Sequence, residues 1–315
     1  MESKEMRAVY AETLIRLGAE NKDIVVVEAD LMKATGTGAF AKTYPERAVN
    51  VGVAEANLVG VASGMSAEGK IPFAATFACF ASRRAFDQFF ISANYARLNV
   101  KLVGTDPGVC AGFNGGTHMP FEDLTLMRVI PNLTIIEPSD PVSLAALVEA
   151  SVNHKGCVYL RLQRKPAPIL YSEGEKFELG KAKVLRKGSA DGKPAQAVIV
   201  ALGALMVGEA LKAADVLAAE GMSVAVIDAL SLKPLDDKLI LEWAEKTGRI
   251  ITCDNHQKRG ALGSAVAEVL AESGKAFKFA RIGVNDEFGE VGTQDWLAER
   301  YKLTAPHIAA AIKAL

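Results

Sequence analysis

The 315-residue chain lacks several features that would assign it to a simple class of protein. Its four cysteines form no C-x-x-C pair, so no disulfide framework or cysteine-zinc site is indicated. No apolar run approaches about 18 residues, and the start, MESKEMRAVYAETL, has no apolar signal core. We therefore expect a soluble, cytoplasmic protein with reduced thiols. The net charge of −1 gives no electrostatic reason to expect nucleic acid or an anionic membrane as partner.

Common catalytic signatures are also missing. The sequence has no G-x-x-x-x-G-K-[ST] loop, no H-E-x-x-H helix and no metal-spaced set of Cys and His, so we predict no metal ligands in this chain. The G-T-G at 36–38 lacks the third glycine of a dinucleotide fingerprint. The G-M-S-A-E at 64–68 lacks the last glycine of a nucleophile elbow.

What is present is an alternation of short apolar runs and helical patterns. IVVVEAD at 24–30 and IPFAATF at 71–77 are typical of buried parallel strands. The stretch from about 165 to 190 is rich in Pro, Gly, Lys and Glu, and the alternation resumes at 197–203 with AVIVALG. Further strands are expected at 49–53, 100–104, 133–136, 158–162, 222–229, 249–255 and 277–282, and helices at 4–18, 81–96, 122–129, 141–153, 205–220, 235–246, 261–273 and 304–314. This order predicts an α/β fold with two domains, built on parallel sheets with helices on both faces.

The most informative stretch is VNVGVAEANLVGVASGMSAEG at 49–69, which carries one carboxylate, Glu55, between small apolar runs. A buried carboxylate is costly unless it has a partner or a task. The dipole at a helix N-terminus favours its anion, whereas apolar neighbours favour its protonated form, so Glu55 is a candidate for holding a mobile proton. The alternative is a structural glutamate that caps a helix or pairs with a buried arginine.

A Gly-rich loop, TDPGVCAGFNGGTHMP at 105–120, follows a predicted strand at the edge where ligands of α/β sheets bind. Within it, Asn114 offers hydrogen bonds and His118 offers proton transfer. A lone histidine is more often a core or capping residue. The unit Asn-Gly-Gly-Thr-His at 114–118 favours a site.

Two further pairs lie at the ends of predicted strands. Phe77 and Phe80 can form a flat apolar platform for a heteroaromatic ring, or belong to the core. Arg161 and Arg164 can hold a phosphate, or remain solvated.

The chain resembles the C-terminal half of a transketolase in GVAEANLVGVASGMSAEGKIPFAATF and GFNGGTHMPFEDLTLMRVIPNLTIIEPSD. It resembles the C-terminal domain of that family in LSLKPLD (230–236) and TCDNHQKRGALGSAVAEVL (252–270). The resemblance implies a parallel-sheet pyrimidine-binding domain at 1–170, a linker at 171–190 and a smaller α/β C-terminal domain at 191–315. It also implies thiamine diphosphate as cofactor and transfer of a two-carbon ketol unit from a ketose (phosphate) to an aldose (phosphate).

Transketolases hold the diphosphate and its Mg²⁺ through a separate domain with a G-D-G…N motif, and no G-D-G occurs in this chain. The chain is therefore similar to the C-terminal subunit of a split transketolase. That resemblance implies a companion N-terminal subunit that carries the diphosphate and Mg²⁺ domain, assembly as a dimer of heterodimers, and inactivity without the companion.

Residues that match the family motifs receive roles from the resemblance. Glu55 matches the glutamate that shares a proton with the pyrimidine ring, and His118 matches a histidine that contacts the hydroxyls of the donor sugar; these two are the expected catalytic residues. The expected cofactor-binding residues are Asp30, Leu31, Glu55, Phe77 and Phe80. The expected substrate-binding residues are Arg7, Asp106, Asn114, His118 and Arg164.

Four positions depart from the family pattern. The usual D-G-P-T-H run has Asn114 and Gly116 in place of its aspartate and proline. Asp106 stands where a histidine is common, and Ala34 stands near a serine that helps to bind phosphate. These departures put the ordinary sugar specificity in doubt, and a branched sugar phosphate or a sulfonated sugar are candidate donors.

Three other interpretations stay open at this point. The beta subunit of a 2-oxo-acid dehydrogenase has the same two domains and a similar glutamate, but the GTHMPFEDLTLMR loop resembles transketolases. A fragment of a deoxyxylulose phosphate synthase is a weaker candidate. A non-catalytic partner subunit is the non-enzyme alternative, and Glu55, Phe77 and His118 together argue against it. We assign His256 no catalytic role and expect it at a domain contact.

Overall fold

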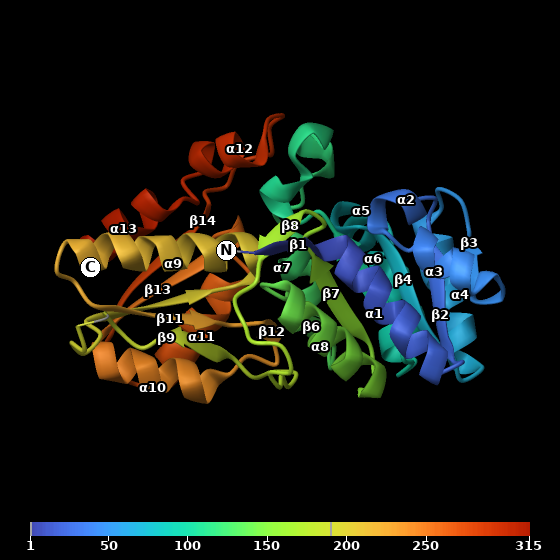
Figure 1. Cartoon of the computed structure of the whole chain (residues 1–315), viewed down its shortest axis with the longest axis horizontal. Coiled ribbons are helices and arrows are strands. Elements are labelled where there is room, and N and C mark those ends of the chain that lie inside the picture. Colours follow the sequence, from blue (N-terminus) through green and yellow to red (C-terminus); the bar gives the residue numbers. More distant parts are fainter. Residues whose placement is uncertain (1, 190) are drawn as a thin grey trace.

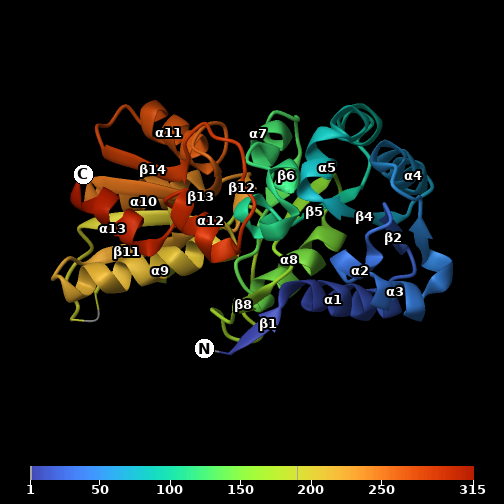
Figure 2. The ribbon, with the colours of Figure 1, turned by 90° about the horizontal axis from the view of Figure 1, so that it is seen from above.

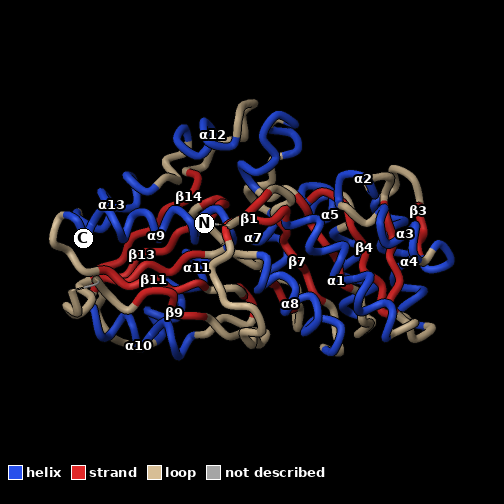
Figure 3. Tube along the Cα trace, in the orientation of Figure 1, coloured by secondary structure: helices blue, strands red, loops and turns tan. Residues whose placement is uncertain are grey.

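The computed structural model describes residues 2–189 and 191–315. The chain forms two lobes that lie side by side along the long axis of the molecule (Figure 1). Each lobe is built on one mostly parallel sheet with helices against both faces (Figure 3). A short antiparallel pair, β1 (Ser3–Glu5) with β8 (Pro166–Pro168), lies between them. The predicted α/β fold is confirmed.

The first lobe contains a seven-stranded sheet in the order β12-β6-β7-β5-β4-β2-β3. Its strands are β2 (Ile24–Glu28), β3 (Ala48–Asn50), β4 (Ile71–Phe77), β5 (Lys101–Thr105), β6 (Thr134–Ile136), β7 (Val158–Leu162) and β12 (Ser231–Lys233). All neighbours from β6 to β3 run parallel. Every residue of β2, β5 and β7 is buried, because helices cover both faces of a parallel sheet.

The helices of the first lobe lie in two layers, with α1, α3 and α8 on one face of the sheet and α4, α5 and α7 on the other (Figure 2). They are α1 (Met6–Glu20), α2 (Met32–Thr35), α3 (Gly38–Thr43), α4 (Glu55–Ala67), α5 (Ala78–Arg83), α6 (Phe86–Gln88), α7 (Asp123–Arg128) and α8 (Pro141–Asn153), with short 3₁₀ turns at Pro45–Arg47, Gly108–Asn114 and Gly116–His118. Within the described ranges, no helix is long and apolar enough to cross a membrane.

The edge strand β12 comes from the second half of the chain and was not predicted. It pairs antiparallel with β6, and Leu232 joins an apolar core that both lobes share. Lys233 donates to the carbonyls of Arg128 and Ile130 at 2.9 and 2.6 Å. Three residues next to a proline are too few to show a strand period, so the pattern gave no signal. The two lobes are joined by a shared sheet and a shared core.

The second lobe contains a five-stranded sheet in the order β14-β13-β10-β11-β9. Its strands are β9 (Lys183–Arg186), β10 (Ala197–Ala201), β11 (Val224–Asp228), β13 (Arg249–Gln257) and β14 (Lys278–Val284), and its helices are α9 (Gly203–Ala219), α10 (Asp237–Thr247), α11 (Leu262–Glu272), α12 (Gln294–Arg300) and α13 (Ala305–Lys313). The strand β9 lies within the expected linker and pairs antiparallel with β11.

One helix prediction was wrong, and a helix of the second lobe was missed. The single helix expected at 81–96 is divided into α5, α6 and a π-helical turn at Phe89–Tyr95, with a break at Ala85. Helix α12 was not predicted, although Thr293 caps it by accepting a hydrogen bond from the Trp296 amide at 3.2 Å. A threonine before Gln-Asp-Trp is an N-cap signal that was available in the sequence.

Candidate active site

Five adjacent strands bring the predicted site residues to one edge of the first sheet. In the order β7-β5-β4-β2-β3, these strands run parallel, so their carboxyl ends meet at the same edge. The residues at or just after these ends are Arg164, Asp106, Phe77, Asp30 and Glu55. The topology therefore gathers residues that lie far apart in the sequence.

Glu55 is the first residue of α4, and its side chain is only 5% exposed. Its Oε1 accepts a hydrogen bond from Arg84 Nη1 at 3.0 Å, the one side-chain hydrogen bond that this carboxylate receives within the described ranges. The sequence predicts apolar neighbours for Glu55 and gives no signal for this cation. Because the Arg84 side chain is 53% exposed, it is not the buried structural partner that the alternative interpretation required.

Aromatic rings connect Glu55 to His118. The Arg84 guanidinium lies over the Phe80 ring, 4.1 Å from its centroid. The centroids of Phe77 and Phe80 are 5.9 Å apart, and the His118 ring meets both edge-on at 6.2 and 5.2 Å. These four side chains and Glu55 therefore form one cluster, and all of them except Arg84 are residues that the sequence singled out as candidates.

The loop that carries His118 is held in place by the second lobe. The Asn255 side chain accepts from the Val109 amide and donates to the Pro107 carbonyl, both at 3.0 Å. A Cβ on Gly116 would come within 2.1 Å of the Gly289 carbonyl oxygen. This close backbone approach explains why the position has no side chain. Asn114 lies on the exposed side of the same loop.

Arg7 and Arg164 lie together at a cationic end of the site. Arg7 Nη1 and Arg164 Nη1 both donate to the Ala34 carbonyl, at 3.4 and 3.2 Å. Arg164 also makes a two-pronged ion pair with Asp106, through Nε to Oδ1 at 2.6 Å and through Nη2 to Oδ2. The guanidinium of Arg164 lies 5.0 Å from the Phe77 centroid, so this end adjoins the aromatic cluster.

The loop with Asp30 and Leu31 is fixed by Glu28, a buried carboxylate that was not among the candidates from the sequence. Glu28 Oε1, at the end of β2, accepts hydrogen bonds from the hydroxyls of Thr35 and Thr37 at 2.6 and 2.5 Å. Burial raises the pKa of Glu28 to about 7, and the two hydroxyls oppose that shift. A carboxylate at the end of the apolar run IVVVE was the available signal.

Arg161 differs from both interpretations offered for it. It is fully buried, with Asp123 accepting from its Nε at 2.8 Å and Glu137 accepting from its Nη1 at 3.0 Å. It is neither solvated nor free to hold a phosphate. His256 is buried beside Thr125 of α7, and burial lowers the pKa of its ring to about 4. This placement agrees with the expected domain contact.

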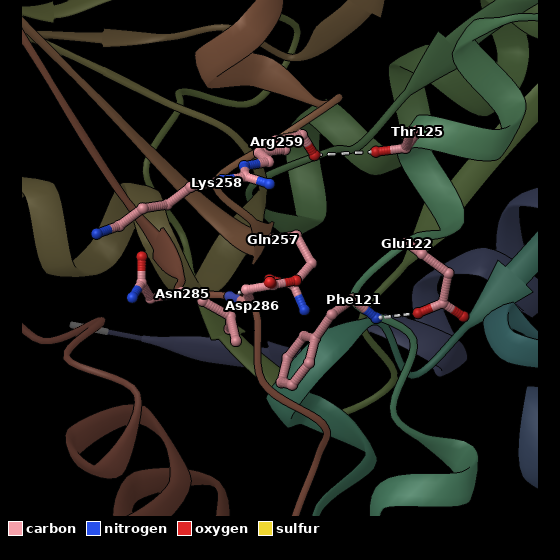
Figure 4. Close-up of a pocket in the computed structure, with 9 residues that line it drawn as sticks. Phe121, Glu122, Thr125, Gln257, Lys258, Arg259, Asn285 and Asp286 are labelled. Atoms are coloured by element: carbon pink, nitrogen blue, oxygen red, sulfur yellow. Dashed lines mark hydrogen bonds between the residues drawn. The ribbon is translucent and has the colours of Figure 1, made fainter.

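A pocket of about 210 Å³ lies between α7 and the second lobe (Figure 4). Its lining includes two cations, Lys258 and Arg259, and two carboxylates, Glu122 and Asp286. Its nine lining residues include none of the predicted site residues. Within the described ranges, no group of three or more His, Cys, Asp or Glu side chains is placed to hold a metal ion.

Residues 2–168 match the transketolase pyrimidine-binding domain, and residues 180–308 match the transketolase C-terminal domain. The chain belongs to the transketolase family. It is 45% identical over 311 residues to the 6-deoxy-6-sulfo-D-fructose transketolase subunit SqwH of Clostridium sp. (strain MSTE9), with 99% of this chain and 94% of the relative covered. It is 40% identical over 311 residues to the putative transketolase C-terminal section of Methanocaldococcus jannaschii, with 98% and 95% covered.

A solved structure of a split-gene transketolase, described as an inactive beta4 tetramer, superimposes with a TM-score of 0.90 at 45% identity. The match covers 98% of this chain and 97% of that one. The chain is therefore a homologue of split-transketolase subunits over nearly its whole length.

The transketolase family implies thiamine diphosphate, and the cluster fits the pyrimidine end of that cofactor. A guanidinium is planar, donates N–H groups and can lie on an aromatic face. Arg84 does both here, bonding Glu55 and covering the Phe80 ring. The carboxylate and the ring face are thus spaced to receive one flat, hydrogen-bonding group, which is what an aminopyrimidine presents.

Proposed function

We propose that this chain is the C-terminal subunit of a thiamine diphosphate-dependent transketolase, which transfers a two-carbon ketol unit from a ketose to an aldose together with a companion subunit. The observation that carries this proposal is the cluster of Glu55, Phe80 and His118 beside the cationic end of the site. A proton-holding carboxylate, an aromatic platform and a histidine are the groups that this chemistry requires from the pyrimidine-binding domain.

In this proposal Glu55 holds and returns a proton at its buried carboxylate, and Phe77 and Phe80 hold the flat ring. When bound, thiamine diphosphate supplies the carbon centre that carries the two-carbon unit. His118 and Asn114 contact the hydroxyls of the donor. Because Arg84 lies where the ring would be received, its half-exposed side chain has to move outward when the cofactor binds.

The diphosphate and Mg²⁺ are assigned to the companion, because the sequence has no G-D-G motif and the described residues include no cluster suited to a metal. Asp30 and Leu31 are proposed as residues of this chain that contact the cofactor. The assembly is proposed as a dimer of heterodimers. The subunit alone is expected to be inactive.

The test is reconstitution with a companion polypeptide that carries the diphosphate domain, for wild type and for Glu55→Gln. Calorimetric titration of thiamine diphosphate with Mg²⁺ is expected to show tight binding only in the mixture. Glu55→Gln removes the proton-holding group, so ketol transfer is expected to fall at least about 100-fold while the two subunits still associate. Glu46→Gln is the matched control, because Glu46 lies on the surface just before β3.

Full ketol transfer by Glu55→Gln would favour the non-catalytic partner subunit. Tight cofactor binding by the chain alone would refute the assignment of the diphosphate to a companion. Oxidation of a 2-oxo acid with transfer to a lipoyl group would favour the dehydrogenase beta subunit.

A further inference from the structure

The cationic end of the site has a carboxylate built into it. Asp106 follows β5, is 2% exposed and has a left-handed φ of 57°. Its two oxygens face Arg164 Nε and Nη2, so the guanidinium fork is filled by a protein carboxylate. A two-pronged pair of this kind needs an ionised carboxylate, because both oxygens accept hydrogen bonds.

The remaining donors at this end are also partly engaged. Arg7 pairs with Glu5 at 2.7 Å, and both arginines donate to the Ala34 carbonyl, which is an acceptor and offers nothing to an anion. Lys165 is the third cation near Asp106. Three cations therefore face two carboxylates, which leaves a net charge of about one positive unit to meet a substrate.

The charge at the far end of the substrate, the end away from its carbonyl, decides whether binding beside Asp106 and Arg164 is favourable. A phosphate monoester carries about −1.5 to −2 charges at neutral pH, whereas a sulfonate carries one. Two negative groups in a site of low dielectric repel each other strongly, and the second one disfavours ionisation of the first. Burial already raises the pKa of Asp106, and Arg164 opposes that shift. A dianion bound beside this pair would disfavour ionisation of Asp106 and so oppose the effect of Arg164.

We propose that Asp106 is a specificity-determining residue, which makes the site select a ketose whose far end carries a single negative charge, of the sulfonate class, over the corresponding ketose phosphate. This inference rests on the proposed ketol transfer. Asp106 neutralises Arg164, and Arg164 keeps enough free N–H groups to bind one singly charged oxyanion.

The first measurement is kcat/KM of the reconstituted complex for two donors that differ only at carbon 6, fructose 6-phosphate and 6-deoxy-6-sulfofructose. Wild type is expected to prefer the sulfonate at least 10-fold. Asp106→Asn keeps the shape of the side chain and removes its charge, so the preference is expected to move toward the phosphate by at least 10-fold. Glu46→Gln, remote from this end, is expected to leave the preference unchanged.

The second measurement does not require turnover. Inorganic phosphate is titrated calorimetrically into wild type and Asp106→Asn, and circular dichroism checks that both are folded. The variant is expected to bind phosphate at least 10-fold more tightly. Equal phosphate affinities, a wild-type preference for the ketose phosphate, or an unchanged preference in the variant would each overturn the inference. Absence of turnover with both donors, combined with tighter phosphate binding by the variant, would reject the proposed ketol transfer and retain the role of Asp106.

Discussion

Arg161 and Arg164 are three residues apart at the end of β7, and the structure uses them in opposite ways. Arg161 is fully buried, and its guanidinium donates to Asp123, to Glu137 and to the Asn255 carbonyl. The Arg164 side chain is 21% exposed, and its three hydrogen bonds go to Asp106 and the Ala34 carbonyl. One arginine closes an interface between the two lobes, whereas the other faces the candidate site.

The difference lies in how many N–H groups remain for a ligand. A guanidinium has five, and every nitrogen of Arg161 is committed to a protein acceptor. Arg164 uses three of its five N–H groups in hydrogen bonds to the protein, and its side chain is partly exposed to solvent. The residue type is the same and both residues lie near the end of β7, so the groups that surround each guanidinium decide which arginine is structural and which can bind a substrate.

The largest expected effect comes from removing Arg161. Arg161→Met leaves Asp123 and Glu137 buried without a cation, and breaking a buried pair costs about 3–5 kcal/mol of unfolding free energy. Urea denaturation of the purified chain measures this loss. Arg164→Met is the matched control and is expected to cost clearly less, because it removes the cation of one buried carboxylate instead of two and the Arg164 side chain is itself 21% exposed. Similar losses in the two variants would contradict the division into structural and ligand-facing arginines.

A second test uses Glu28, a buried carboxylate that forms no ion pair with any residue that the structure describes. Because the pKa of Glu28 is raised to about 7 from an ordinary 4.5, the native state binds more protons than the unfolded state between these values. The unfolding free energy of the wild type is therefore expected to fall as the pH rises from about 4.5 to 7. By the upper end of this range the loss reaches up to about 3 kcal/mol. Glu28→Gln cannot ionise, and its amide oxygen can still accept from Thr35 and Thr37.

The measurement is the difference in unfolding free energy between Glu28→Gln and wild type, by urea denaturation at pH 5 and pH 8. We expect a small difference at pH 5 and a clear advantage for the variant at pH 8. Comparing the two proteins at each pH removes the contribution of Asp228 and Asp254, whose pKa values burial also raises to about 7. A constant difference at both pH values would show that Glu28 is not the titrating group.

A third and smaller effect is expected at the site itself. Arg164→Lys keeps the charge and loses the planar fork, so Asp106 and a substrate anion can no longer be bound side by side. The donor KM of the reconstituted complex is expected to rise about 10-fold, equivalent to about 1.4 kcal/mol, with kcat changed much less. Steady-state kinetics with varied donor measure the two constants. A fall in kcat at constant KM would place Arg164 in the chemical step.

The sequence predicted the sheet edge better than the contacts made there. Hydrophobic runs such as IVVVE identify buried parallel strands, and parallel strands must bring their following loops to one edge. That logic, with the family resemblance, was sufficient to propose Glu55, Phe77 and His118 as site residues. It was insufficient for Arg84, because a single predicted helix at 81–96 gave no direction for that side chain.

The fate of Arg161 was unpredictable for a related reason. Its partners come from α7 and from the residue after β6, and its third acceptor is a carbonyl of the second lobe. Local patterns carry no information about such distant contacts. The strand β12 was missed for the same reason, since its place is set by pairing with β6 rather than by its own sequence.

The smallest expected effect comes from an arginine that pairs on the surface. Arg16 of α1 donates to Glu149 of α8 at 2.6 Å, and both side chains are about half exposed. Exposed pairs gain little because water screens the charges and two long side chains lose freedom, so Arg16→Ala is expected to cost less than about 1 kcal/mol. Urea denaturation in low and high salt measures the loss, which should shrink further in high salt. A loss comparable to that of Arg161→Met would mean that burial does not separate the arginines of this chain.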